Sequence, residues 1–187
     1  MPTREDAFNL LNENVASESL RRHCLAVAHA MEAYAKKNNQ DSEKWFICGL
    51  LHDFDYEKFP NEHPTPGVKI LQEKGYDKEI IQAILSHAVE RTAVQRESIM
   101  DKCLFAVDEL CGFLVALAKV RPDNFAGMDA KSVEKGLKKK GFAAAINRED
   151  IEKGVSELGT DREEHFNFVI SALREHAKEL GLSRTLL

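Results

Sequence analysis

Apolar residues recur at intervals of three and four along most of the chain, which is the spacing of one face of an α-helix. The clearest stripe consists of Leu20, Val27, Ala30, Met31 and Tyr34. No pair of alternating segments is joined by the turn residues of a β-hairpin, and no period of 20 to 50 residues repeats. The pattern therefore predicts an all-α protein.

Polar residues that can cap a helix precede the apolar stripes. They are the capping box Thr3-Arg4-Glu5-Asp6, Ser17 or Ser19, Asp41-Ser42, Asp77, Asn147, and a second box at Thr160-Asp161-Arg162-Glu163. Each marks the expected start of a helix.

Prolines and glycines show where the helices should end. Residues 56–66 contain three prolines and are expected to form a loop, and the helix that follows should run to Gly75. A long apolar helix is expected from Ser98 to Val120, where Arg121-Pro122 ends it. The composition of the chain changes after Arg121-Pro122. Residues 1–120 are therefore expected to form the core, and residues 121–187 a helical extension packed on it. The last helix, expected from Arg162 to Leu180, would be a lid or a brace, or part of a homodimer contact.

Composition narrows the class of protein. The chain of 187 residues is 43% hydrophobic and 30% charged, with a net charge of -5, which is typical of a soluble globular protein and argues against binding a nucleic-acid polymer. No apolar run approaches the ~20 residues of a membrane span, and the N-terminus lacks the apolar core of a signal peptide. We therefore expect a cytoplasmic protein without a membrane partner. Four cysteines without C-x-x-C spacing are expected to be reduced core thiols: Cys24, Cys48, Cys103 and Cys111.

The stretch FICGLLHDFD, residues 46–55, places charge beside an apolar run. His52-Asp53 and Asp55 follow six residues that are almost all apolar. Burying a carboxylate and an imidazole there costs free energy unless something pairs with them. The partner is either a metal ion or an ordinary hydrogen bond.

Further ionisable residues point inward from other helices. The helical neighbours of His23 and of His87 are apolar, so both imidazoles are expected to face the core. Asp108 and Glu109 share an equally apolar helix, and periodicity does not choose between them. The remaining helical histidines have neighbours of mixed polarity and are expected at the surface: His29, His165 and His176.

This set of residue types suits metal chemistry. Imidazole nitrogens and carboxylate oxygens bind borderline to hard divalent ions, and open coordination positions allow catalysis. A divalent ion can lower the pKa of water and stabilise charge on phosphoryl oxygens. The set is thus a candidate site for metal-assisted hydrolysis, with ordinary hydrogen-bonded pairs as the alternative.

The order of these residues resembles the H…HD…D arrangement of the HD-domain superfamily of metal-dependent phosphohydrolases. The match runs over about residues 15–120, with His23, His52-Asp53 and Asp108 in the motif positions. It implies a helical bundle around a buried metal held by His23, His52, Asp53 and Asp108, and it selects Asp108 over Glu109. The later segment, VRP at 120–122 and SVEKGLKKKGFAAAINRE at 132–149, resembles a poorly characterised subgroup of predicted HD-superfamily hydrolases.

The resemblance leaves the number of metal ions open at one or two. Two-metal members show the order H…HD…H…H…D, in which the counterpart of Asp53 bridges the ions. His63 and His87 fall in the required order, although His63 in the loop NEHPTPG could equally face solvent or cap the next helix. The metal would be Mn, Mg, Co, Fe, Zn or Ni.

Other charged residues near the motif are candidates for supporting roles. Asp55, Glu57 and Glu62 could orient a histidine or act as general acid, with Asp53, Asp55 and Glu62 taken as the catalytic set. Arg91 and Lys102 could bind a phosphate, whereas Arg96 is expected at the surface.

The sequence therefore predicts a metal-dependent phosphohydrolase that acts on a small phosphorylated molecule such as a nucleotide, through water activated by the metal. Two alternatives stay open. One is a dinuclear iron oxygenase of the HD type, and the other is a ligand-binding or regulatory HD module without turnover.

Overall fold

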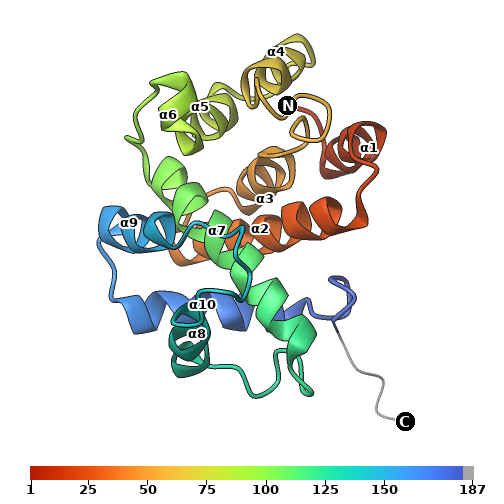
Figure 1. Cartoon of the computed structure of the whole chain (residues 1–187). Coiled ribbons are helices and arrows are strands. Elements are labelled where there is room, and N and C mark those ends of the chain that lie inside the picture. The colour runs from red at the N-terminus through yellow and green to blue at the C-terminus, as the bar shows by residue number, and fades with distance from the viewer. Residues whose placement is uncertain (183–187) are drawn as a thin grey trace.

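The computed structural model describes residues 1–182, and within them the chain is all-helical, as predicted (Figure 1). The helices are α1 (Arg4–Asn14), α2 (Glu18–Lys37), α3 (Ser42–Leu51), α4 (Thr65–Glu73), α5 (Lys78–His87), α6 (Val89–Thr92), α7 (Ile99–Val120), α8 (Ala130–Leu137), α9 (Arg148–Leu158) and α10 (Arg162–Glu175).

Most helices begin where a capping residue predicts. Thr3 and Asp6 form the reciprocal capping box of α1, and Ser17 rather than Ser19 caps α2. The second predicted box is wrong by one residue, because Asp161 rather than Thr160 caps α10 through a bond from the Glu164 amide. The last helix also ends earlier than predicted. It stops at Glu175, and turns carry the chain on to the buried Leu180.

Helices α2 and α3 pack closely against each other at the centre of the molecule. Every residue from Trp45 to Leu51 is buried, so the apolar run is a helix enclosed on all sides. Gly49 allows this approach, because a Cβ there would lie 2.7 Å from the Cα of Ala28 on α2. The long helix α7 packs against α2 and α5 and also contacts α3.

The C-terminal segment continues the same hydrophobic core. α9 packs on α7, and α10 packs on α2, α8 and α7. The predicted apolar stripe of α10 lies within the core, with Phe166, Val169, Ile170 and Leu173 all buried. α10 is therefore a brace along α2 and α7.

Two histidine predictions were wrong. His29 is only 4% exposed and His165 only 1%. His165 lies between α2 and α7, where Tyr34 Oη donates to its Nδ1 at 2.6 Å and its Nε2 donates to the Ala106 carbonyl at 3.1 Å. Packing of α10 covers both imidazoles, and helical periodicity within one segment does not report such contacts. His176 is partly exposed.

The cysteines behave as predicted, since all four are buried and free of disulfides. Among residues 1–182, no helix combines the length and the apolar character needed to cross a lipid bilayer.

Candidate metal centre

Three helices bring a first group of donors together. His23 projects from α2, His52 follows the last residue of α3, and Asp108 lies on α7. His23 Nε2 is 3.1 Å from Asp108 Oδ1 and 3.2 Å from His52 Nε2, and His52 Nε2 is 3.3 Å from the same Asp108 oxygen. These atoms are close enough to surround one ion.

A second group of donors lies on the other side of Asp53. His63 comes from the loop before α4, and His87 ends α5. Their Nε2 atoms are 3.2 Å apart, and they lie 3.2 Å and 3.6 Å, respectively, from Asp53 Oδ1. The loop histidine thus faces the interior rather than solvent, and it is 4% exposed.

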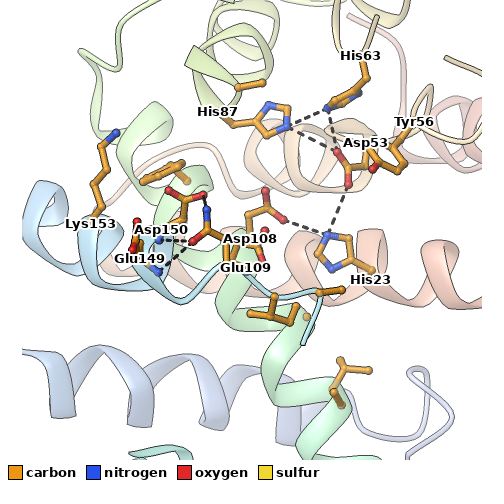
Figure 2. Close-up of a pocket in the computed structure, with 18 of the residues that line it drawn as sticks. His23, Asp53, Tyr56, His63, His87, Asp108, Glu109, Glu149, Asp150 and Lys153 are labelled. Carbon is orange, nitrogen blue, oxygen red and sulfur yellow. Dashed lines mark hydrogen bonds and ion pairs between the residues drawn. The ribbon is translucent and has the colours of Figure 1, made fainter. Parts of the chain in front are cut away.

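Asp53 joins the two groups through separate oxygens. Its Oδ1 faces His63 and His87, while its Oδ2 lies 3.5 Å from His52 Nε2 and 3.8 Å from His23 Nε2. Figure 2 shows this carboxylate between His63 and His87 on one side and His23 on the other. The arrangement offers two adjacent ion positions bridged by one carboxylate.

The histidine tautomers indicate that a cation belongs between these donors. The Nδ1–H of His52 donates to the Gly49 carbonyl at 2.8 Å, that of His63 to Asp55 at 2.6 Å, and that of His87 to the Ile84 carbonyl. A neutral imidazole that donates from Nδ1 carries a lone pair on Nε2. Nε2 atoms and carboxylate oxygens therefore converge on two points, where either protons on the imidazoles or a metal ion must supply positive charge. The residues present fit divalent metal ions.

The electrostatics of the centre agree with this fit. Burial alone would lower the pKa of His52 and of His63, but the nearby carboxylates outweigh it and raise each pKa to about 9. Burial alone would raise the pKa of Asp53 and of Asp108, but the surrounding imidazoles outweigh it and hold the pKa of both carboxyls well below the usual range. Without an ion, protons on these imidazoles compensate the ionised carboxylates, and a divalent ion bound between the donors would replace those protons.

The three acidic residues proposed for supporting roles lie in different places. Asp55 is 2% exposed, and its second oxygen accepts from the Gly67 amide at 2.9 Å while the first holds His63. Glu57 is exposed and accepts from the amides of Ala16 and Ser17. Glu62 is exposed and does not line the cavity beside the centre. Of the three, only Asp55 touches a candidate ligand.

A cavity of about 970 Å³ opens beside the donors. Arg91 lines it, as the sequence suggested, and its guanidinium donates to the Pro60 carbonyl at 2.8 Å. Lys102 does not line it, because it lies on the first turns of α7, away from Asp108. Arg96, expected at the surface, is held by Glu157 at 2.6 Å and by the Ser86 carbonyl.

Several cavity residues were missed by sequence reasoning. Lys119 lies on α7 eleven residues after Asp108, which is three helical turns along the same face, so its position could have been inferred from periodicity. α9 contributes Glu149, Asp150 and Lys153, which Figure 2 shows across the cavity from His23 and His63. No local pattern in residues 148–158 indicates this contact.

Glu109 also faces the cavity, so both carboxylates of the α7 pair are present at the site. Burial and the adjacent Asp108 charge raise the pKa of Glu109 to about 7, and its carboxylate accepts from the Asn147 amide at 3.1 Å. Only Asp108 reaches the histidines.

Comparison with known proteins agrees with the fold. Residues 20–111 match the HD domain family, so this part of the chain is an HD domain, which supports membership of the HD-domain superfamily. Membership indicates a metal-dependent, hydrolase-type function and the binding of divalent metals. No curated protein and no solved structure gives a significant match.

Proposed function

We propose that this protein is a metal-dependent phosphohydrolase that acts on a small phosphorylated molecule such as a nucleotide. The observation that carries the proposal is the position of Asp53, whose two oxygens face separate histidine pairs at the wall of a cavity large enough for such a substrate. All six motif residues, His23, His52, Asp53, His63, His87 and Asp108, would be ligands. Two ions bound there would polarise a phosphoryl oxygen and make water a stronger nucleophile.

The chain itself would position the substrate. Arg91, Lys119 and Lys153 line the cavity and would attract the phosphate, while Phe105 and Ile146 provide apolar wall for the rest of the molecule. The Arg91 guanidinium is fixed at one nitrogen by the Pro60 carbonyl and keeps further N–H groups for a phosphate oxygen. Binding of this kind holds the phosphorus close to the donors that surround Asp53.

Asp55 would act as a positioning residue rather than as an acid. Both of its oxygens are occupied, by the His63 ring and by the Gly67 amide, and it is buried away from the cavity lining. A carboxylate behind a ligating imidazole fixes the tautomer and the ring orientation. Glu62 has no comparable contact, so we assign it no part in the reaction.

The test is turnover by the purified protein. We would supply Mn²⁺, Mg²⁺, Co²⁺, Fe²⁺, Zn²⁺ or Ni²⁺ in turn and screen phosphomonoesters and nucleotides for released phosphate. Asp53→Asn should abolish turnover and metal binding at this centre, whereas Glu57→Gln, two residues from Asp55 on the exposed side of the same turn, should retain both. Equal turnover by Asp53→Asn and the parent would contradict the proposal.

The six-residue, two-position geometry also supports a second candidate, a dinuclear iron oxygenase. That chemistry requires a redox-active metal and consumes dioxygen, whereas a hydrolase accepts several divalent ions and works without oxygen. Anaerobic assays in Mn²⁺ and in Fe²⁺ separate the two. Metal binding without turnover of any substrate would instead favour a regulatory HD module.

A further inference from the structure

A second cluster of metal-type donors lies apart from the HD centre. His29 and Glu32 are on α2, His176 follows the last residue of α10, and Glu179 lies in the next turn. Single donor atoms of His29, Glu32 and His176 all lie within 4.8 Å of one another. Glu179 adds its carboxylate, which is 3.3 Å from His29 Nε2 and 3.0 Å from His176 Nδ1. None of the four lines the cavity at Asp53.

The burial of His29 is the main evidence for a ligand in this cluster. It is 4% exposed, and neither ring nitrogen has a hydrogen-bond partner within residues 1–182. Glu179 and Glu32 are within ion-pair distance of its nitrogens, at 3.3 Å and 3.9 Å, but neither contact has the direction of a hydrogen bond. Buried polar atoms are nearly always paired, so two unpaired nitrogens on one buried ring need an explanation.

The surroundings keep His29 in place and leave His176 free to adjust. Phe46 packs edge-on against the His29 ring at 5.4 Å between centroids. His176 stacks on the His29 ring at 3.6 Å between centroids, with an angle of 11° between the planes. Its side chain is 29% exposed and lies beyond the end of α10. Imidazole lone pairs lie in the ring plane, so one ion can reach both rings only after the His176 ring turns out of the stack.

We propose that His29, Glu32, His176 and Glu179 form a site for a divalent transition metal, with zinc as the best fit, which fastens the C-terminal segment to α2. Two imidazoles with carboxylates are a borderline donor set that favours zinc, cobalt or nickel over magnesium or calcium. The ion would connect two parts of the chain that are far apart in sequence, 29–32 and 176–179. It would thereby stabilise the packing of α10 as a brace, which is a structural rather than a catalytic effect.

The test separates this site from the HD centre. Untagged Asp53→Asn/Asp108→Asn protein should still bind one Zn²⁺ in equilibrium dialysis and show a higher melting midpoint with Zn²⁺ than with chelator. Adding His176→Gln to that variant should remove the bound ion and the shift, while Glu175→Gln, a neighbouring exposed change, should remove neither. The same His176→Gln change in the parent should lower zinc stoichiometry by one ion.

Three results would overturn the proposal. One is a His176→Gln variant of the parent with unchanged zinc stoichiometry, and another is an Asp53→Asn/Asp108→Asn protein that takes up no zinc although it folds. The third is a melting midpoint that does not change with Zn²⁺ but changes on acidification, in a way that depends on His29 and His176. The cluster would then bind protons rather than a metal ion. Loss or survival of phosphohydrolase activity bears on none of these outcomes.

Discussion

Replacing Asp55 with asparagine tests whether the second histidine pair holds an ion. The Asp55 carboxylate accepts two hydrogen bonds, from His63 Nδ1 at 2.6 Å and from the Gly67 amide at 2.9 Å. An amide of the same shape has a single oxygen. The Asp55→Asn side chain could therefore satisfy one donor, while its NH₂ group would face the N–H of the other.

The expected magnitude follows from that loss. Removing an acceptor behind a metal-ligating histidine typically weakens metal binding about 10- to 100-fold, or ~1.4 to ~2.8 kcal/mol. The effect should fall on the ion between His63, His87 and Asp53. The ion between His23, His52 and Asp108 should keep its affinity, because Asp55 contacts none of those three residues.

Isothermal titration with Mn²⁺ measures the two affinities separately. The parent should show two binding events at this centre, and Asp55→Asn should show one unchanged and one weakened. Glu57→Gln is the matched control, since Glu57 is exposed and bonds to Ala16 and Ser17 instead. Two ions bound to Asp55→Asn with parental affinities would refute the proposed position of the second ion. An equal loss of affinity for both ions would show that Asp55 affects the stability of the whole protein rather than one ion position.

Three other predictions concern stability. Chelation of the bound metal should lower the melting midpoint. The free energy of unfolding should fall by ~2.7 kcal/mol if the free ion was present at about 100 times its dissociation constant, and an unchanged midpoint would argue against metal in the core. Burial lowers the pKa of His165 from 6.5 to about 4, so below pH 6.5 the unfolded chain gains a proton that the folded chain does not. The free energy of unfolding should then fall by up to ~1.4 kcal/mol per pH unit between pH 6.5 and 4. When this free energy is measured by urea denaturation at several pH values, it should depend less steeply on pH in His165→Gln than in the parent. Gly154→Ala should cost ~1 to ~3 kcal/mol, because its Cβ would lie 2.7 Å from the Ala106 Cα. Gly141→Ala, which meets nothing within 4 Å, is the control in the same denaturation assay.

Local chemistry made most of the helices predictable. Capping side chains such as Asp41 and Asp77 sit directly before apolar stripes, and they cap α3 and α5 in the structure. The error at α10 arose because Thr160 and Asp161 can both accept from a helix N-terminus. Only the backbone, extended at Asp161 with φ -67° and ψ 137°, distinguishes them.

The candidate site was predictable in part. The apolar neighbours of His23, His87 and Asp108 indicated inward side chains, and the structure brings all three to one centre. The pairing of separate Asp53 oxygens with different histidines depends on tertiary packing that no helical period encodes. Sequence reasoning failed for the same reason at His29 and His165, which are covered by packing from another part of the chain.

The packing of α9 on α7 has a practical consequence for work on this protein. Residues 20–111 match the family, but α9 and the residues before it supply one wall of the cavity. A fragment ending at Val120 would lose Ile146 and Lys153 and would uncover the buried Ala106 and Phe113 on α7. Such a fragment would carry every motif residue and still present an open, apolar surface prone to aggregation. Assays of substrate choice therefore require the full chain, because the part that defines the family is not sufficient to enclose a substrate.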